Sequence, residues 1–257
     1  MHPVLFHLGS VTVYTYGFLI ALGAVAGGLY MWRQGSKEYG MTFDQANTLF
    51  VLLIVAGVVG GKLFMIFENP SYYFKHLSEL LSSNGFVFYG SLLTAIPLML
   101  WYFKKNKLPV RGMLDIMAVV TCLVHGFGRI GCFNAGCCYG IPTEKPWGVT
   151  FTDTACQAQP LGESLHPTQL YEATFIFCII FFLIRLKPRK TFNGQLFLTY
   201  LMIYAAGRCM LEIFRGDMQR GFIFNGLLST SQAISILIIA VAAFFFIRWR
   251  KANLLSN

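Results

Sequence analysis

The segment Ala46–Phe67 has the sequence ANTLFVLLIVAGVVGGKLFMIF, in which Lys62 is the only charged residue. A helix needs about 20 mostly apolar residues to cross the hydrocarbon core of a bilayer. This segment is long enough and apolar enough to do so. It predicts a membrane-spanning helix, and the rest of the chain has the same character.

The composition excludes several broad classes of protein. Apolar residues make up 56% of the 257 residues and charged residues only 12%, against about 25% charged in ordinary soluble domains. The mean hydropathy is +0.59. A soluble globular, disordered or collagen-like chain is therefore excluded, and an integral membrane protein is predicted.

Seven apolar stretches predict an all-α protein with seven transmembrane helices. The opening MHPVLFHLGS lacks a basic region and a small-residue cleavage site, so we expect no removable signal peptide. The short connections leave no room for a second soluble domain, so residues 1–257 are expected to form one membrane domain with a long loop at about 133–167. The predicted spans are Val13–Trp32, Ala46–Phe67, Phe86–Phe103, Met113–Cys132, Thr168–Leu186, Gln195–Phe214 and Ser231–Trp249.

The distribution of basic residues predicts the orientation in the membrane. The net charge of +9 lies in short clusters between apolar runs, which is typical of membrane orientation and argues against a nucleic-acid partner. By the positive-inside rule, the N-terminus is outside and the C-terminus is cytoplasmic. The cytoplasmic side holds Arg33, Lys37, Lys104, Lys105, Lys107, Arg111, Arg185, Lys187, Arg189, Lys190, Arg248, Arg250 and Lys251, and the outer side holds Lys75, Lys145, Arg215 and Arg220.

Small residues recur at four-residue spacing in the first two spans. Gly23 and Gly27 lie in the first, and Gly57 and Gly61 in the second. This pattern lets helix backbones approach closely in lipid, so we interpret these glycines as packing residues.

Polar side chains gather at one depth of the predicted bundle, in the outer half of the membrane. Ionisable groups inside spans are costly and usually functional. The opposite half has only Asp115, near its interface. The outer set consists of Tyr16, Lys62, Tyr89, His125, Arg129, Glu172, Tyr204, Arg208 and Glu212.

The sixth span places Tyr204, Arg208 and Glu212 on one helix face, because they are spaced four residues apart. The Arg208–Glu212 pair could be a structural ion pair, and Lys62 could snorkel to the interface. At this depth, however, cations outnumber carboxylates. An arginine fork suits phosphate oxygens, so the pattern indicates a site for a lipid phosphate.

The outer loop is rich in glycine, proline and cysteine and could cover the site. Cys132, Cys137, Cys138 and Cys156 face an oxidising compartment, so a structural disulfide is expected. A zinc site completed by His125 or His166 stays open, although the cysteine spacing matches no standard zinc motif. Neither a bound metal nor a cofactor is expected.

Several motifs in order resemble those of the prolipoprotein diacylglyceryl transferase family. The run HGFGRIGCFNAGCCYGIPT at His125–Thr143 is similar to the family's signature G-R-x-G-N-F-x-N-x-E. The further matching stretches are Tyr16–Gly17, GGKLFMIFEN at Gly60–Asn69, GFVFYGSLL at Gly85–Leu93, HPTQLYE at His166–Glu172 and YAAGRCMLEIFRGD at Tyr204–Asp217.

The resemblance implies transfer of a diacylglyceryl group from phosphatidylglycerol to the lipobox cysteine of a preprolipoprotein. A thioether would form and glycerol phosphate would leave, at the outer face of the bacterial inner membrane. The partners implied are phosphatidylglycerol, the lipobox peptide and membrane lipids. The catalytic candidates are Arg129, Arg208, Glu212 and His125, and the substrate-binding candidates are Tyr16, Lys62, Tyr89, His166, Glu172 and Tyr204.

The chain departs from the family pattern at four positions. Cys132, Ala135 and Cys137 replace the signature's two asparagines and its glutamate, and Tyr89 stands where the family often has histidine. The family's common general base is therefore missing. His125, His166 or the lipid phosphate itself could accept the thiol proton.

Two other functions remain open at this point. One is a related phospholipid-using transferase with a different acceptor, suggested by the lost asparagine and glutamate positions. The other is a non-enzymatic seven-span transporter or receptor. Against the latter, the polar groups do not continue into the cytoplasmic half.

Overall fold

The apolar runs of the sequence form helices, because a backbone in lipid must satisfy its own hydrogen bonds. The computed structural model describes residues 2–9, 11–76, 87–159, 161–216, 221–223 and 228–256, and it is 72% helical. Gly85, Phe86, Asp217 and Arg220, which the sequence analysis used, lie outside these residues. The chain divides into two compact units, one of Met1–Tyr30 with Leu114–Asn257 and one of Met31–Met113.

Six helices among the described residues are long and apolar enough to cross a membrane, which confirms a polytopic membrane protein. The helix α5 (Phe88–Lys105) contains most of the expected third span but is not one of the six. The seven-span count and the orientation stay predictions. The six are α1 (Thr15–Tyr39), α2 (Phe43–Glu68), α6 (Val110–Ala135), α7 (Thr168–Leu186), α8 (Gln195–Leu211) and α9 (Thr230–Ser256).

Short turns extend two of these helices. The described residues also form three small strand pairs, which the all-α expectation did not include. The turn η1 (Lys187–Arg189) continues α7, and η2 (Glu212–Phe214) continues α8. The antiparallel pairs are β1 (Val4–Leu8) with β2 (Val11–Tyr14), β3 (Val149–Thr150) with β4 (Ser164–Leu165), and β5 (Phe222–Ile223) with β6 (Leu228–Ser229). The strands of the last two pairs, with two residues each, are too short to show an alternating pattern in the sequence.

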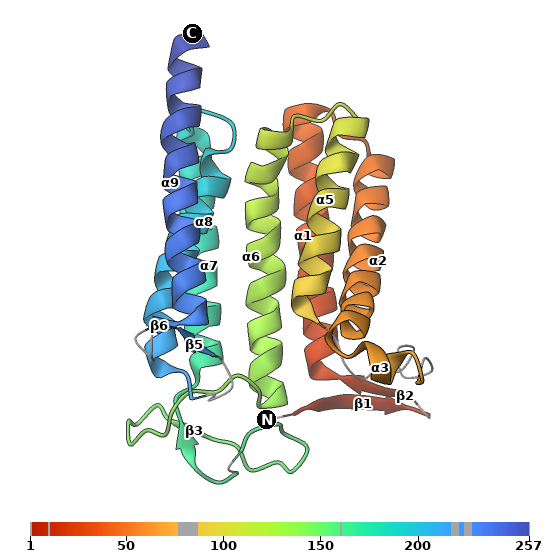
Figure 1. The fold of residues 1–257 in the computed structure, drawn as a ribbon, viewed down its shortest axis with the longest axis vertical. Helices are drawn as coiled ribbons and strands as arrows, with labels where there is room; N and C mark the ends of the chain where they lie inside the picture. The colour runs from red at the N-terminus through yellow and green to blue at the C-terminus, as the bar shows by residue number, and fades with distance from the viewer. Residues whose placement is uncertain are drawn as a thin grey trace. The chain divides into compact units, whose positions relative to one another are not determined.

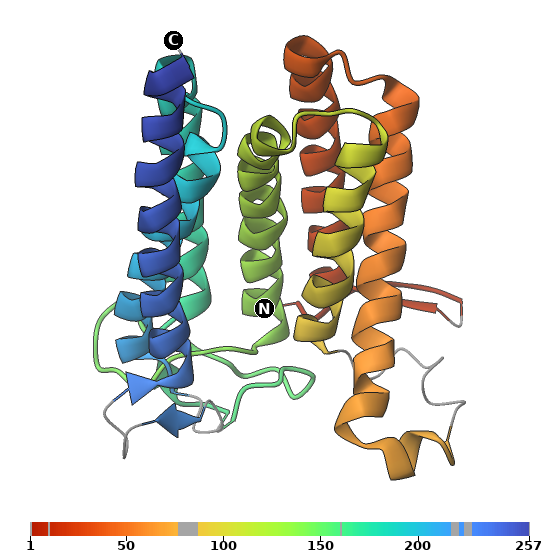
Figure 2. The same ribbon diagram turned by 45° about the horizontal axis from the view of Figure 1, so that its top comes forward.

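The core of the first unit lies between α6, α7 and α8. A second apolar contact joins α8 to α9, which lie side by side in both ribbon views (Figures 1 and 2). The ends of α7 and α8 that carry the site lie at the same end of the unit as β3, β5 and β6 (Figure 1). The buried residues of the main cluster include Cys122, Ile176, Ile179, Leu183, Leu196 and Tyr200.

A buried carboxylate links α6 to the start of α8. Asp115 is only 1% exposed, and its oxygens accept the backbone N–H groups of Gly194 at 2.9 Å and Phe197 at 3.0 Å. Lys190 Nζ lies 3.4 Å from the same carboxylate. Since the first N–H groups of a helix have no partner within it, Asp115 acts as a cap supplied by another helix.

The glycines of α1 pack as the sequence predicts. A Cβ atom at Gly23 would lie 2.9 Å from Phe127 Cβ, and one at Gly27 would lie 3.0 Å from Val120 Cγ1. The lack of a side chain at these positions lets α1 approach α6 closely, most of all at Gly23, where a Cβ atom would also lie 3.1 Å from the Leu123 carbonyl oxygen.

In the second unit, α2 packs against α5, and the glycine in closest contact is Gly60. Gly57 contacts α5 through its backbone, because Ser91 Oγ donates to its carbonyl at 2.7 Å, but the space of its missing side chain is not used, because a Cβ atom there would meet nothing within 4 Å. At Gly60 it would lie 2.6 Å from the Gly90 carbonyl oxygen. Thr94 Oγ1 donates across the same crossing to the Ala56 carbonyl at 2.8 Å. The unit also includes the short helix α3 (Pro70–Tyr73).

Candidate functional site

Charged side chains from α6 and α7 meet at Glu172. His125 and Arg129 are one turn apart on α6 and so share a face. Arg129 Nε lies 3.1 Å from Glu172 Oε2, and His125 Nε2 lies 3.3 Å from Glu172 Oε1. The Glu172 side chain is only 4% exposed. A buried carboxylate needs such partners, because an unpaired charge there is costly.

The helix α8 and the turn η2 that continues it add three more side chains. Tyr204 donates its hydroxyl hydrogen to Glu172 Oε1 at 3.0 Å, and its ring meets the His125 ring edge-on with centroids 5.3 Å apart. Arg208 Nη1 lies 2.6 Å from Glu212 Oε2, and Arg208 is also within electrostatic range of Glu172. These residues, His125, Arg129, Glu172, Tyr204, Arg208 and Glu212, form the charged cluster.

Two further candidate residues lie in the same unit. Tyr16, in the first turn of α1, packs on α6 at Gly131, where a Cβ atom would lie 3.0 Å from the tyrosine ring. His166 Nδ1 lies 3.0 Å from the Tyr171 hydroxyl, and its ring contacts Phe214. The His166 carbonyl accepts the Gly140 N–H at 2.9 Å. His166 thus ties the outer loop to the start of α7.

Lys62 and Tyr89 belong to the second unit. Lys62 is half-buried on α2, and Tyr89 lies exposed in the first turn of α5. Their expected part in the site stays a prediction.

Three cysteines come together where α6 ends. The Sγ atoms of Cys132, Cys137 and Cys138, here called the thiol cluster, all lie within 4.8 Å of one another. All seven cysteines, each of which lies in the described part of the chain, are free thiols. The expected disulfide is therefore not formed in this structure. These cysteines are adjacent because the chain turns back on itself directly after the helix.

Side chains at the start of α7 hold the backbone of this turn. Thr168 Oγ1 donates to the Cys138 carbonyl at 2.7 Å, and Gln169 Nε2 donates to the Cys137 carbonyl at 2.6 Å. Cys138 has a φ of 60°, a left-handed conformation that costs a residue other than glycine about 1–3 kcal/mol. Such a conformation persists only where the surroundings hold it, as the two hydrogen bonds do here.

The neighbouring sulfurs change the acidity of the Cys138 thiol. Hydrogen bonds from the Cys132 and Cys137 thiols hold the pKa of Cys138 well below the usual range of a thiol. The positive charges of Arg129 and Arg215 act in the same direction.

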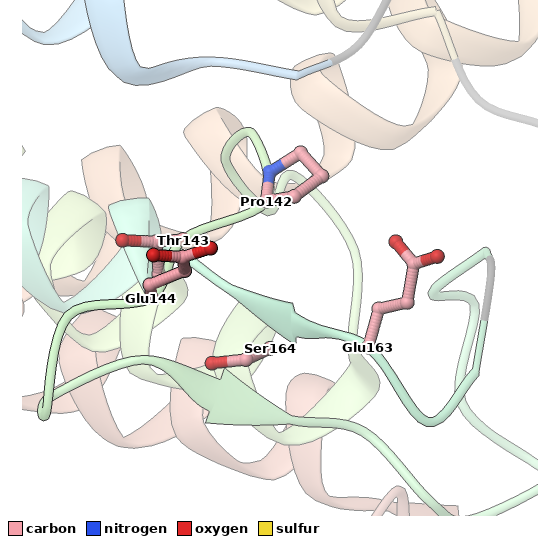
Figure 3. A pocket seen from close by; sticks show the side chains of 5 residues that line it. All are labelled: Pro142, Thr143, Glu144, Glu163 and Ser164. Atoms are coloured by element: carbon pink, nitrogen blue, oxygen red, sulfur yellow. The ribbon is translucent and has the colours of Figure 1, made fainter.

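The outer loop also has a surface pocket, lined by Pro142, Thr143, Glu144, Glu163 and Ser164 (Figure 3). Its carboxylates belong to exposed side chains of the loop. Its lining includes no member of the charged cluster. We therefore place the candidate site at the charged cluster and not at this pocket.

Two features of the site escaped the sequence analysis. Glu172 was expected as one substrate-binding residue among several, yet it joins side chains from α6 and α8. Its place in HPTQLYE, one turn into a span, was the available signal. The hydrogen bonds that Thr168 and Gln169 make to the thiol-bearing turn had no signal in the sequence.

The apolar helices define a polytopic membrane protein. Its candidate site is the charged cluster, which lies near the ends of three of these helices. The model of the prolipoprotein diacylglyceryl transferase family matches residues 3–248. The chain belongs to this family and is an enzyme of the transferase class.

Relatives match over nearly their full length. The phosphatidylglycerol–prolipoprotein diacylglyceryl transferase of Clostridium tetani is 39% identical over 96% of this chain and 97% of its own. A second enzyme of that name from Clostridium perfringens is 34% identical over 93% and 92%, and one from Dehalococcoides mccartyi is 31% identical over 97% and 94%. These matches do not favour the transporter, the receptor or a different acceptor.

Proposed function

We propose that this chain transfers the diacylglyceryl group of phosphatidylglycerol to the lipobox cysteine of preprolipoproteins, forming a thioether and releasing glycerol phosphate. The names of its relatives supply the lipid and the class of protein acceptor. One observation carries the proposal for the site. Arg129 and Arg208, from different helices, both lie within electrostatic range of the buried Glu172.

The two guanidinium groups suit the leaving group of this reaction. Substitution at the glyceryl carbon expels a phosphate, so negative charge grows on phosphate oxygens in the transition state. Both close contacts of Arg129, to Glu172 and to His125, use Nε. Its two terminal nitrogens then serve as donors to phosphate oxygens, in the forked geometry that arginine provides. Glu172 and Glu212 would fix the orientation of the two arginines.

His125 is our candidate for the base that removes the thiol proton. Its Nε2, when unprotonated, accepts a hydrogen bond from Arg129 Nε at 3.3 Å. After protonation the same nitrogen would donate to Glu172 Oε1, also 3.3 Å away. The carboxylate thus stabilises the cation that proton transfer creates. We assign substrate-binding roles to Tyr16, Lys62, Tyr89, His166, Glu172 and Tyr204.

We also propose that α5 is the seventh span and that residues 1–257 form one membrane domain, with its N-terminus outside and its C-terminus in the cytoplasm. The uneven distribution of basic residues supports this orientation. The protein would then lie in the bacterial inner membrane with the charged cluster toward the outer face, where exported prolipoproteins carry their lipobox.

The test uses the purified chain, phosphatidylglycerol vesicles and a synthetic lipobox peptide, with the peptide mass as readout. We expect the mass to rise by one diacylglyceryl group. Arg129→Ala and Arg208→Ala should each lower the rate at least about 100-fold. Arg185→Ala, an exposed arginine at the other end of α7, is the matched control. An unmodified peptide, or full activity in both site variants, would overturn the proposal.

Changing His125 tests the assignment of the base. His125→Gln keeps a hydrogen-bonding side chain but cannot take up a proton. We expect a loss of about 100-fold in rate, a typical contribution of a general base. Full transferase activity in this variant would rule out His125 as the base.

A further inference from the structure

The thiol cluster has the spacing of ligands around one metal ion. The three Sγ atoms lie within 4.8 Å of one another. In a tetrahedral zinc site with Zn–S bonds of about 2.3 Å, the sulfurs are about 3.8 Å apart. A small movement of the side chains would therefore bring all three sulfurs to one ion.

The turn that carries two of these thiols is held in place from outside. The hydrogen bonds from Thr168 and Gln169 fix the carbonyls of Cys138 and Cys137. Cys132 lies in the last turn of α6, and its carbonyl accepts the Cys137 N–H at 3.1 Å. The sulfurs are thus brought together without a metal, which lowers the entropy cost of binding one.

Positively charged side chains near the thiol cluster would balance the negative charge of a zinc site with three thiolates. Three thiolates around a divalent ion carry a net charge of −1. Arg129 and Arg215 both lie within electrostatic range of Cys138. The backbone brings Arg215 there, because Gly140 pairs with Arg215 and the Ile141 N–H donates to the Phe214 carbonyl at 2.9 Å.

We propose that Cys132, Cys137 and Cys138 bind one Zn²⁺ ion, whose fourth tetrahedral position takes the thiolate of the acceptor cysteine. The second half of this inference rests on the proposed function. Zinc with three protein ligands keeps a position for water or substrate. Arg129 lies one turn before Cys132 on the same face of α6. An acceptor sulfur on the metal would therefore be held beside the guanidinium group that binds the phosphate.

The metal would supply a thiolate at neutral pH. The acceptor thiol gives up its proton, through solvent to His125, when its sulfur binds Zn²⁺, since a coordinating thiol is deprotonated. The sulfur then forms a bond to the glyceryl carbon, the bond from that carbon to the phosphate oxygen breaks, and the electron pair leaves with glycerol phosphate. The thioether product is neutral and a weaker ligand, so it dissociates from the metal. No oxidant or reductant is needed.

Metal binding can be measured without either substrate. The full chain, purified under reducing conditions, is titrated with Zn²⁺ and, as a spectroscopic probe, with Co²⁺. We expect about one equivalent bound, with thiolate-to-cobalt absorption. Cys132→Ser, Cys137→Ser and Cys138→Ser should each lower affinity at least about 10-fold. Binding of no ion, or unchanged binding in all three variants, would overturn the site, as would a disulfide within the cluster in protein whose free thiols are alkylated before any reduction.

Two other cysteines serve as controls. Cys178 is exposed on α7 and remote in sequence from the turn. Cys156 lies close to the turn, since a Cβ atom at Gly136 would be 3.2 Å from its Sγ. Both Cys178→Ser and Cys156→Ser should bind the metal normally. Loss of binding in Cys156→Ser would mean that the protein fills the fourth position, which overturns the role of the acceptor thiol.

A last measurement separates this inference from the proposed function. A lipobox peptide should shift the cobalt spectrum, whereas the same peptide with serine in place of its cysteine should not. Removing the metal with a chelator should lower the transfer rate about 100-fold, and Zn²⁺ should restore it. Undiminished transfer by metal-free protein would overturn the inference and leave the function standing. A spectral shift without transfer would support the site and contradict the function.

Discussion

Glu172 Oε2 on α7 lies 3.1 Å from Arg129 Nε on α6, with the carboxylate almost wholly buried. Because Glu172 also contacts His125 and Tyr204, it is the residue that joins the three helices of the site. Four sets of variants test the contacts of Glu172 and, separately, the helix packing within each unit.

The first concerns the charge of Glu172. Glu172→Gln keeps the shape of the side chain but leaves Arg129 without its counter-ion. Removing one partner of a buried ion pair costs about 3–5 kcal/mol. We expect lower thermal stability and a loss of transferase activity, measured on the same detergent-purified sample. Glu163→Gln, in the outer loop, is the control, and wild-type stability and activity in Glu172→Gln would contradict the prediction.

The second concerns the Tyr204 hydroxyl. Tyr204→Phe removes its 3.0 Å hydrogen bond to Glu172 but keeps the ring contact with His125. A hydrogen bond to a charged group contributes about 1.5–3 kcal/mol. We expect a loss of roughly 10-fold in the rate of transfer, smaller than the effect of Glu172→Gln. The exposed Tyr14→Phe should behave as wild type. A Tyr204→Phe variant less active than Glu172→Gln would mean that the hydroxyl acts in the reaction itself.

The third concerns Asp115, which caps α8 far from the charged cluster along α6. Asp115→Asn removes the charge that Lys190 contacts and leaves one oxygen to serve two backbone N–H groups. We expect the free energy of unfolding to fall by about 1–3 kcal/mol, detected as a lower melting temperature. Activity well below that temperature should survive. Asp44→Asn, at an exposed position, is the control. A change in activity without loss of stability would show that the role is not structural.

The fourth concerns the crossing of α2 and α5. Gly60→Val places a branched side chain where even a Cβ atom would lie 2.6 Å from the Gly90 carbonyl oxygen. We expect destabilisation of at least about 1–3 kcal/mol, as for other overpacked interiors. Gly57→Ala, one turn earlier on the same helix, should be tolerated because no atom lies within 4 Å of its Cβ position. Equal melting temperatures of the two variants would contradict this account of the crossing.

Gly57 and Gly60 show what a pattern of small residues predicts and what it does not. Small residues at four-residue spacing identify helices suited to close packing, and Gly23 and Gly27 do pack as predicted. Which face of α2 meets its neighbour depends on how the helix is rotated, and the repeating pattern does not contain that rotation. The six apolar helices and the membrane class were predictable, because length and hydrophobicity are local properties of the chain.

The sequence by itself also determined which side chains are charged at the depth of the site, and their one-turn spacing on α6 and α8. The four-residue spacing on α8 already suggested that Arg208 pairs with Glu212, whereas only the tertiary structure decided that Arg129 pairs with Glu172 from another helix. It alone brought three thiols together, in a turn that α7 holds from outside. Ion pairs and hydrogen bonds act over a few ångströms, so partners on different helices are set by how those helices pack.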